Sequence, residues 1–316
     1  MESGSKGPGS LFNRNLVSIK QLDKGVIEEI LAESERMLEI YKSNSRPNLL
    51  GGRIMASMFF EPSTRTRLSF ESAMHRLGGS VIGFADPLST SSAKGETLSD
   101  TVRIMSAYAD ILVIRHPTEG AITGALDSAS VPLVNAGDGT GQHPTQALYD
   151  LFAIKKEKGR LTNLNVALVG DLKHGRAIHS LAYALAIFGN SLTLISPQSL
   201  KMPARMVADL ERSYGIRIIQ HDSLDQALNA DAVYIPRMQK ERFSDQKEYE
   251  RVAAYYVIDK RFMAMAGSDT IILSPLPRTM EINPEVDTMK NAAYFRQAAY
   301  GVPVRMAVLK MILKGR

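Results

Sequence analysis

The sequence predicts an α/β protein of two domains, each built on a mainly parallel sheet flanked by helices. Three observations predict this class. The chain has 316 residues, about twice the size of an average domain. Hydrophobic residues make up 44% of it, which is enough for two sizeable cores. Short apolar runs of strand length alternate with longer stretches of helical spacing, and this alternation is typical of parallel sheets covered by helices.

The first series of elements occupies residues 11–144, after a Gly- and Ser-rich start at 1–10 that we expect to be a flexible leader rather than a signal peptide. Helical spacing of apolar residues predicts the helices, short apolar runs predict the strands, and stretches rich in Ser, Thr and Gly predict the loops. In chain order these are a helix at 23–42, a strand at 54–60, a helix at 64–77, a strand at 81–84, a loop at 86–96, a helix at 98–108, a strand at 111–115, a helix at 121–129, a strand at 131–135 and a loop at 136–143.

The second series occupies residues 145–300, with the domain boundary expected between 143 and 151. Pro144 opens a helix that runs to about residue 158, since proline costs no hydrogen bond in a first turn. The elements that follow are a strand at 166–169, a helix at 176–188, a strand at 192–195, a helix at 203–214, and strands at 216–220, 232–235, 256–258 and 271–273. The last helix, 302–313, is expected to pack back on the first domain, so that residues 301–316 complete it.

Composition excludes several classes of protein. The chain has no cysteine, which rules out disulfides, thiolate metal sites and a cysteine nucleophile. The most apolar stretch, 181–195, is too short to span a bilayer, so we expect a cytoplasmic protein with no membrane partner. The formal charge is +5, yet no basic run exceeds two residues, and we expect no nucleic-acid partner. The excess positive charge indicates either a solvated, slightly basic surface or several arginines that converge on a small anionic substrate.

The most informative segment is 59–67, Phe-Phe-Glu-Pro-Ser-Thr-Arg-Thr-Arg, which joins a predicted strand to a predicted helix. Ser63 or Thr64 can cap the helix, and Arg65 and Arg67 fall in its first turn. Cations are poorly placed there, because a helix N-terminus carries positive partial charge. An anion at the same point would reverse the problem and make the segment a phosphate cradle. The alternative is an ordinary cap with solvated arginines.

Two more segments of the first domain carry polar groups near strand ends. Arg115 ends a predicted strand and could point at the same anion, or it could be solvated. The glycine-rich segment 135–146 places His143 and Gln146 about one turn apart at a helix start. A histidine there tends to stay neutral and can donate a hydrogen bond to a carbonyl oxygen. The alternative is a loop histidine at a domain hinge.

The loop 89–96, Ser-Thr-Ser-Ser-Ala-Lys-Gly-Glu, carries a single lysine, Lys94. From composition alone a mobile surface loop is the simpler interpretation. Such a loop can also carry its lysine to an anion in another site, including the site of a neighbouring subunit.

Three segments of the second domain carry chemistry. Segment 169–176 lacks the Gly-x-Gly-x-x-Gly fingerprint, so a nicotinamide enzyme is not expected, and Arg176 suits a carboxylate instead. Arg237 and Gln239 share one side of an extended stretch and together can grip a second carboxylate, or they belong to a solvated charged loop. The Ser-Pro-Leu-Pro-Arg segment at 274–278 has a fixed backbone whose carbonyls could face a ligand amine, or it is a rigid exit turn.

Together these segments resemble the aspartate/ornithine carbamoyltransferase family from about residue 16 to residue 313. The Ser-Thr-Arg-Thr-Arg segment is common to the whole family. Residues 142–146 and 237–242 match its aspartate branch. The ornithine branch carries a His-Cys-Leu-Pro stretch where this chain has Ser-Pro-Leu-Pro at 274–277.

The resemblance implies transfer of the carbamoyl group of carbamoyl phosphate to the amine of L-aspartate, a step of de novo pyrimidine synthesis. It implies that residues 11–144 with 301–316 form the carbamoyl-phosphate-binding domain and residues 145–300 the aspartate-binding domain. It also implies closure of the domains on the substrates, no cofactor and no metal ion. The family's catalytic chain is a homotrimer with shared active sites, which in some members is joined to regulatory chains.

The resemblance assigns roles at both substrates. For carbamoyl phosphate, the implied ligands are Ser63, Thr64, Arg65 and Thr66 for the phosphate, Arg115 for phosphate and carbonyl oxygens, His143 with Thr66 for the carbonyl oxygen, and Gln146 with the backbone of Pro275 and Leu276 for the amino group. Ser91 and Lys94 come from the adjacent chain, and Lys94 also contacts aspartate. Arg176 takes the α-carboxylate, and Arg237 and Gln239 take the β-carboxylate. Glu61 is the implied partner of Arg176 and Arg242 in the closed state.

Departures from the family pattern lie on the aspartate side. They are Pro236 for the usual Thr, Ala177 for Thr, Ser274 for His, and Thr279-Met280 for Val followed by Asp or Asn. Three rival interpretations stay open: a carbamoyltransferase for another anionic amino-acid acceptor, a non-catalytic member of the fold, and nucleic-acid binding through the basic surface.

Overall fold

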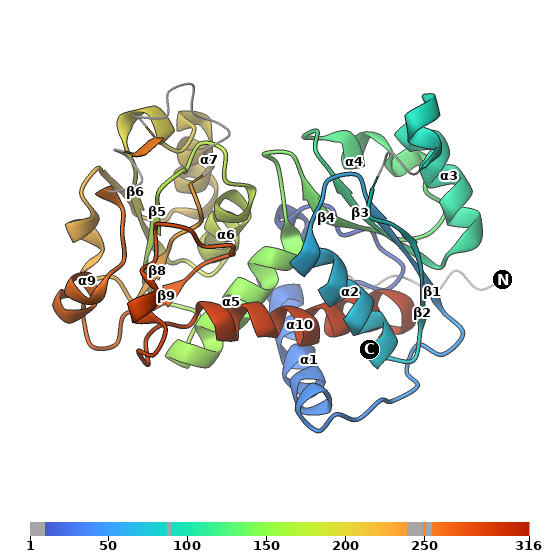
Figure 1. The fold of residues 1–316 in the computed structure, drawn as a ribbon, viewed down its shortest axis with the longest axis horizontal. Helices are drawn as coiled ribbons and strands as arrows, with labels where there is room; N and C mark the ends of the chain where they lie inside the picture. The colour runs from blue at the N-terminus through green and yellow to red at the C-terminus, as the bar shows by residue number, and fades with distance from the viewer. Residues whose placement is uncertain (1–9, 87–89, 239–248, 251–254, 316) are drawn as a thin grey trace. The chain divides into compact units, whose positions relative to one another are not determined.

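The computed structural model describes residues 10–86, 90–238, 249–250 and 255–315 (Figure 1). The chain divides into two compact units. Unit 1 holds residues 1–148 and 300–316, and unit 2 holds residues 149–299. Each unit contains its own parallel sheet with helices around it, so the predicted fold class is confirmed. The expected leader at residues 1–10 lies outside the described residues except for Ser10.

Unit 1 is built on a four-stranded sheet in the order β2-β1-β3-β4, with every pair parallel. Its strands are β1 (Ile54–Phe59), β2 (Ser80–Phe84), β3 (Ile111–His116) and β4 (Leu133–Asp138). The strand order reverses direction between β1 and β3, which makes the carboxyl ends of these two strands the switch point of the sheet. Ligands of open α/β sheets bind at such points.

The helices of unit 1 follow the apolar periodicity of the sequence. They are α1 (Lys24–Lys42), α2 (Thr64–Arg76), α3 (Leu98–Tyr108) and α4 (Ala121–Gly124), with the 3-10 turns η1 (Ile19–Gln21), η3 (Ser91–Lys94) and η4 (Leu126–Ser128). Asp23 caps α1 by accepting from the Val26 N–H at 2.9 Å, and Thr97 caps α3. Buried residues of β1, β3 and α3, among them Ala56, Leu112 and Val102, form one core cluster.

Two long helices contain residues of both units. Helix α5 (Pro144–Lys158) passes from unit 1 to unit 2 after Leu148, and α10 (Tyr294–Lys314) passes back at Tyr300. The end of α10 packs within unit 1, as predicted, where Lys310 lies 3.3 Å from the buried Glu33 of α1. Among the described helices, none is long and apolar enough to cross a membrane.

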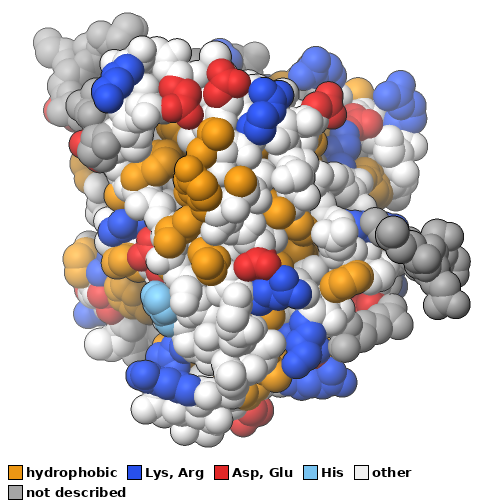
Figure 2. Space-filling model, turned by 90° about the vertical axis from the view of Figure 1, so that its right-hand side faces the viewer, with side chains coloured by type: hydrophobic (Ala, Val, Ile, Leu, Met, Phe, Trp, Pro, Cys, Tyr) orange, Lys and Arg blue, Asp and Glu red, His pale blue; other side chains and the backbone are white. Residues whose placement is uncertain are grey.

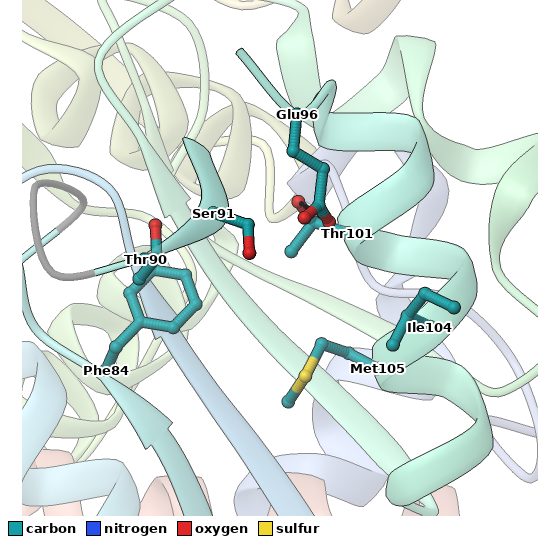
Figure 3. Close-up of a pocket in the computed structure, with 7 residues that line it drawn as sticks. All are labelled: Phe84, Thr90, Ser91, Glu96, Thr101, Ile104 and Met105. Atoms are coloured by element: carbon teal, nitrogen blue, oxygen red, sulfur yellow. Dashed lines mark hydrogen bonds between the residues drawn. The ribbon is translucent and has the colours of Figure 1, made fainter. Parts of the chain in front are cut away.

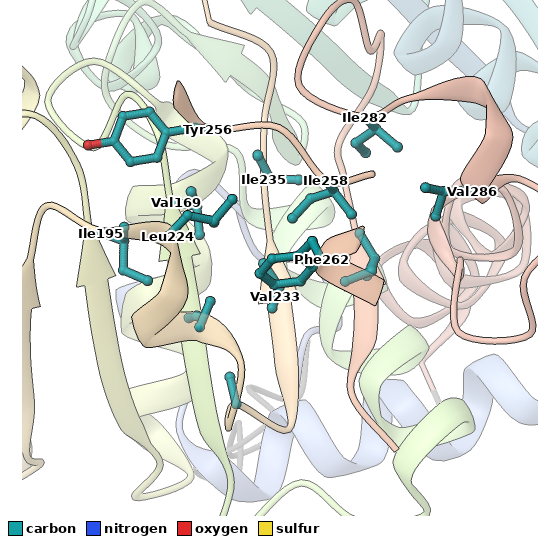
Figure 4. Close-up of a cluster of buried hydrophobic side chains, with 14 of the residues drawn as sticks. Val169, Ile195, Leu224, Val233, Ile235, Tyr256, Ile258, Phe262, Ile282 and Val286 are labelled. Carbon is teal, nitrogen blue, oxygen red and sulfur yellow. The ribbon is translucent and has the colours of Figure 1, made fainter. Parts of the chain in front are cut away.

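Unit 2 is built on a five-stranded parallel sheet in the order β7-β6-β5-β8-β9. Its elements are β5 (Asn165–Val169), α6 (Arg176–Ile187), β6 (Ser191–Ile195), η5 (Gln198–Leu200), α7 (Ala204–Tyr214), β7 (Ile218–His221), η6 (Leu224–Ala227), β8 (Ala232–Tyr234), α9 (Lys260–Met265), β9 (Ile271–Leu273) and η8 (Pro284–Val286). Figure 4 shows the core on one side of this sheet, where Val169, Ile195 and Val233 of the strands meet Phe262 of α9. The order again reverses at a pair of central strands, here β5 and β8.

Four predicted elements were wrong in extent or kind. The helix at 121–129 is broken into α4 and η4 after Gly124, since glycine weakens a helix. The strand at 131–135 lies at 133–138, so Gly137 and Asp138 belong to β4 rather than to the following loop. The segment 256–258 forms only one bridge, Ile258 to Ile282. Helix α10 begins at residue 294 rather than 302, and it continues through Gly301 and Pro303.

Candidate active site

The switch point of unit 1 brings two predicted site segments together. Phe59, the last residue of β1, pairs with Arg115 of β3, and the Phe60 N–H donates to the Arg115 carbonyl oxygen at 2.9 Å. The chain leaves β1 after Phe59 and enters α2 at Thr64. The parallel pairing therefore places the start of the Ser-Thr-Arg-Thr-Arg segment beside the end of β3.

Ser63 occupies the N-cap position of α2 with an extended backbone, φ −158° and ψ 103°. The predicted N-cap position is confirmed at Ser63, although its hydroxyl makes no capping hydrogen bond. No acidic residue stands in the first turn. The helix start thus presents main-chain N–H groups, the exposed Thr64 and Arg65, and Thr66, which is only 7% exposed. Such an arrangement attracts an anion.

Arg115 is held by a carboxylate from the same edge of the sheet. Its Nη2 donates to Oε1 of Glu61 at 3.1 Å, and its side chain is 12% exposed. A buried guanidinium needs a partner, and Glu61 also fixes the direction in which its fork points. Within unit 1, Glu61 bonds Arg115, a contact that the resemblance did not assign to it, and Arg242 lies outside the described residues.

His143 and Gln146 lie at the start of α5, and each is 4% exposed. The Gln146 N–H donates to the His143 carbonyl oxygen at 3.0 Å, which holds the two residues in one turn, as their spacing predicted. Both follow β4, the strand next to β3, so they lie at the same carboxyl edge of the sheet as Arg115.

A residue that the sequence prediction missed fixes the loop before His143. Asp138 is 5% exposed, and its carboxylate accepts from the N–H groups of Gln142 at 2.7 Å and Gly120 at 3.2 Å. Gly139 has φ +48°, and a Cβ there would lie 2.4 Å from the Glu119 nitrogen, so only glycine fits. The Gly-Asp-Gly pattern at 137–139 was the available signal, since an aspartate between glycines is typical of a turn in which the carboxylate accepts from nearby backbone N–H groups.

Ser91 and Lys94 begin and end the turn η3, which follows β2 at the edge of the sheet, and both are exposed. Beside this turn lies a pocket of about 200 Å³ lined by Phe84, Thr90, Ser91, Glu96, Thr101, Ile104 and Met105 (Figure 3). Thr101 donates to the Glu96 carboxylate at 3.0 Å, and Ile104 and Met105 line the pocket from α3. The loop that was expected to be a mobile surface segment thus contains a helical turn packed over a partly apolar hollow.

The carboxyl edge of the unit 2 sheet gathers the other predicted residues. Arg176 opens α6 after β5, Arg237 follows β8, and Pro275 and Leu276 follow β9. These three strands are neighbours in one parallel sheet, so their carboxyl ends meet at one edge. Arg176 and Arg237 are half-buried, and Gln239 lies outside the described residues.

The loop before Arg176 is organised by Asp171, which is 3% exposed. Its Oδ1 accepts from the N–H groups of Lys173 at 3.1 Å and His174 at 3.0 Å. At Gly175, the N-cap of α6, a Cβ would lie 2.9 Å from the Asp171 carbonyl oxygen. The glycine that did not complete a dinucleotide fingerprint therefore has a packing role.

A buried relay that the sequence prediction also missed holds the Ser274–Leu276 turn. Asp150 is fully buried and accepts from the Tyr234 hydroxyl at 2.9 Å and from Nε2 of Gln297 at 2.6 Å. Gln297 in turn accepts from the Ser274 N–H at 2.8 Å, and the Ser274 hydroxyl accepts from the Leu276 N–H at 3.2 Å. The sequence signal of these bonds was the position of Asp150, a carboxylate among the apolar residues of α5.

Two titratable groups near these edges have shifted pKa values. Burial lowers the pKa of His116, next to Phe60. The hydrogen bond from Arg278 lowers the pKa of Asp287, and Tyr294 donates to the same carboxylate. Within the described residues, no three His, Asp or Glu side chains group as metal ligands would.

Comparison with known proteins identifies the family. The model of the aspartate/ornithine carbamoyltransferase carbamoyl-P binding domain matches residues 14–156, and the model of the Asp/Orn binding domain matches residues 162–312. An aspartate carbamoyltransferase catalytic subunit from Methanothermobacter thermautotrophicus is 51% identical over 303 residues, covering 96% of both chains.

Two solved structures share the fold over nearly the whole chain. The catalytic subunit of M. jannaschii aspartate transcarbamoylase has a TM-score of 0.86 at 47% identity, covering 94% of this chain and 97% of that one. The Trypanosoma cruzi aspartate transcarbamoylase in complex with carbamoyl phosphate and aspartate has a TM-score of 0.91 at 38% identity, covering 97% of each. The two domain models together cover residues 14–156 and 162–312, and the relative from Methanothermobacter covers 96% of the chain. The chain belongs to the aspartate/ornithine carbamoyltransferase family.

Proposed function

We propose that this enzyme transfers the carbamoyl group of carbamoyl phosphate to the amine of L-aspartate, giving N-carbamoyl-L-aspartate and phosphate in de novo pyrimidine synthesis. One observation supports it above the others: each parallel sheet gathers arginines and a helix start at its own carboxyl edge. A phosphate suits the edge of unit 1, and the two carboxylates of aspartate suit Arg176 and Arg237 at the edge of unit 2. The relatives that carry the name aspartate carbamoyltransferase support the same activity.

In this proposal the phosphate of carbamoyl phosphate binds at the start of α2. Ser63, Thr64 and Thr66 offer hydroxyls and N–H groups, and Arg65 offers a guanidinium. These groups stabilise the negative charge that grows on the phosphate as its bond to the carbonyl carbon breaks. The cations of the first turn, which are unfavourable beside an empty helix start, then gain a counter-ion.

The carbonyl oxygen of the substrate receives hydrogen bonds from Arg115, His143 and Thr66. Gln146 and the backbone of Pro275 and Leu276 hold the carbamoyl amino group. Glu61 and Asp138 act indirectly, because the first orients Arg115 and the second fixes the loop that precedes His143. Fixed donors of this kind stabilise the oxyanion without having to reorganise during the reaction.

Aspartate binds through Arg176 at its α-carboxylate and through Arg237 and Gln239 at its β-carboxylate. Its neutral amine attacks the carbonyl carbon to form the new C–N bond. The C–O bond to phosphate breaks, phosphate leaves with the electron pair, and the amine proton passes to the departing phosphate. Orientation and charge account for this catalysis, and the proposal needs neither cofactor nor metal ion.

The proposal includes a homotrimer in which Ser91 and Lys94 serve the site of a neighbouring chain. Exposed apolar side chains of unit 1 support an interface: Ile82 is 38%, Ile104 51% and Tyr108 59% exposed. Figure 2 shows a face on which hydrophobic side chains gather between charged ones. Exposed apolar groups gathered in this way are typical of protein interfaces. A cytoplasmic location is part of the proposal, as in the reducing compartment to which a chain without cysteine is suited.

The test of the proposed activity is carbamoyl transfer by the purified chain to a panel of acceptors: aspartate, glutamate and ornithine. Parallel reactions blocked with phosphonoacetate serve as controls. Formation of carbamoyl aspartate well above that of the other products is expected. Activity with another anionic amino acid would favour the rival acceptor, and no transfer to any acceptor would contradict the proposal.

The test of the shared site is complementation. Lys94→Ala and Arg65→Ala oligomers should each be almost inactive, and mixing them under subunit exchange should restore activity at interfaces that pair two intact groups. Native mass spectrometry measures the oligomer and confirms exchange. Mixed oligomers without recovered activity would mean that Lys94 does not serve a neighbouring site.

A further inference from the structure

A buried arginine far along the chain contacts the helix start that carries the phosphate cradle. Arg305 of α10 is 3% exposed, and its Nη1 donates to the Ser69 hydroxyl at 2.7 Å. The Ser69 Oγ lies 2.6 Å from the carbonyl oxygen of Arg65 and 2.9 Å from that of Thr66. All four residues belong to unit 1.

The direction of these hydrogen bonds follows from the chemistry of the groups. A guanidinium only donates, whereas a serine hydroxyl has one proton and two acceptor lone pairs. Because Arg305 occupies a lone pair of Ser69, the single hydroxyl proton is directed to the carbonyl oxygens of Arg65 and Thr66. Arg305 therefore orients the hydrogen bond that the Ser69 hydroxyl donates to the carbonyl oxygens of Arg65 and Thr66. These are two of the residues proposed to bind the phosphate directly.

The burial of Arg305 also needs an explanation. Its guanidinium lies 4.7 Å from the centroid of the fully buried Phe70 ring, on the same helix as the cradle. A buried cation is costly unless hydrogen bonds and nearby charge offset the loss of water. The bond to Ser69 and the face of the Phe70 ring contribute to this compensation.

We propose that Arg305 is a positioning residue for phosphate, acting through Ser69 on the first turn of α2. The proposal rests on the function proposed above. It predicts that loss of Arg305 or of the Ser69 hydroxyl loosens the Arg65–Thr66 turn and weakens the binding of phosphate more than it weakens the use of aspartate. Neither residue touches the substrate.

The other end of α2 provides a matched control. There Nε of Arg76 donates to the Ser72 hydroxyl at 3.3 Å, and its guanidinium lies 4.6 Å from the Tyr41 ring centroid. The chemistry is the same: an arginine, a serine of α2 and an aromatic face. The difference is the place, because Arg76 is the last residue of the helix and Ser72 lies two turns from the cradle.

The experiment measures binding of inorganic phosphate to the full-length oligomer by calorimetry, and the KM for each substrate. The variants are Arg305→Gln, Ser69→Ala, their double mutant and Arg76→Gln. Arg305→Gln and Ser69→Ala should each raise the phosphate Kd and the KM for carbamoyl phosphate about five- to tenfold, which corresponds to one hydrogen bond. The double mutant should add little to the worse single variant, because both act through one relay. Arg76→Gln should lower Tm and leave both binding values unchanged.

The outcomes separate this inference from the proposed function. A wild-type oligomer that binds neither phosphate nor carbamoyl phosphate would contradict the proposed function itself. A wild type that binds, with unchanged values in Ser69→Ala and Arg305→Gln or equal loss in Arg76→Gln, would overturn the role of Arg305 alone. If Arg305→Gln does not fold, Ser69→Ala decides the question, since it deletes only one half-buried hydroxyl.

Discussion

The two carboxyl edges of the molecule hold their residues by different means. In unit 1 the cradle is the first turn of a 13-residue helix that follows a central strand, so most of its geometry comes from local structure, and Ser69 joins it to one distant residue, Arg305. In unit 2 the Ser274–Arg278 turn is irregular, and side chains that follow it in the chain hold it: Gln297 at Ser274 and Asp287 at Arg278. A helix start keeps most of its geometry through its own hydrogen bonds, whereas an irregular turn has no repeating bonds of its own and depends on the side chains that hold it. Variants should therefore damage the two edges in different ways.

The largest effect is expected from Arg65→Ala at the edge of unit 1. Arg65 is exposed, so the fold should survive, while the loss of a charge aimed at the leaving phosphate should lower kcat by about 10²- to 10³-fold. Steady-state kinetics measure the loss, and thermal unfolding shows whether the fold is intact. Near-normal turnover in a folded variant would mean that the helix start does not bind phosphate.

Arg237→Ala should damage the edge of unit 2 selectively. Its proposed partner is the β-carboxylate of aspartate, so the KM for aspartate should rise about 10²-fold while carbamoyl phosphate binds as before. Calorimetry with carbamoyl phosphate alone and kinetics with varied aspartate separate the two. A loss of carbamoyl phosphate affinity as large as the loss of aspartate use would show that Arg237 is misassigned.

The relay behind Ser274 tests whether the turn of unit 2 needs remote support. Gln297→Ala removes the group that joins Asp150 to the Ser274 N–H, whereas Tyr234→Phe removes one bond to Asp150 and leaves that join intact. Both should cost about 1–3 kcal/mol of stability because a buried carboxylate loses a donor. We expect only Gln297→Ala to raise the KM for carbamoyl phosphate as well, by about tenfold. Equal kinetics in the two variants, measured at matched stability, would mean that the relay only stabilises the fold.

The same difference explains what the sequence could predict. Strand ends and helix starts are encoded locally by apolar runs, caps and prolines, which is why α2, α3 and α5 lie where they were predicted, to within one residue. The partners of their polar residues were not encoded locally. Arg305 reaches Ser69 and Gln297 reaches Asp150 across 236 and 147 residues, and no periodicity connects such positions. At Ser63 the N-cap position was predicted correctly, but the side chain makes no capping hydrogen bond.

Local rules also failed where packing outweighed propensity. The prediction started the last helix at 302, yet α10 runs from 294 to 314 and contains both Gly301 and Pro303, which are poor helix formers. Buried residues on both sides, Tyr294 and Gln297 before and Val304 and Met306 after, hold it in place. Conversely, 256–258 has the composition of a strand but forms a single bridge, because composition alone does not supply a neighbour to pair with.

The smallest expected effect concerns the far end of the turn in unit 2, where Arg278 donates to Asp287 with Nη2 2.6 Å from Oδ2. That hydrogen bond lowers the pKa of Asp287 below its unfolded value of about 3.9. A lowered carboxyl pKa adds stability that is fully present above the unfolded pKa and is lost as pH falls through the folded pKa. Asp287→Asn should therefore lower Tm slightly at pH 7 and pH 5, with a difference that shrinks below about pH 4.

The control is Glu39→Gln, which removes a carboxylate from an exposed pair with Lys42 in α1. Such a pair contributes little, so the Tm of this variant should match that of wild type at every pH. A constant Tm difference for Asp287→Asn from pH 7 to pH 3 would show that the substitution acts by altered packing rather than through the charge of Asp287. A Tm difference between Asp287→Asn and wild type that disappears at low pH would mean that the charge of Asp287 stabilises the fold. If this variant also has a slightly raised KM for carbamoyl phosphate, the turn is held at Arg278 as well as at Ser274. The irregular edge of unit 2 would then depend on two separate anchors, where the helical edge of unit 1 has its own first turn.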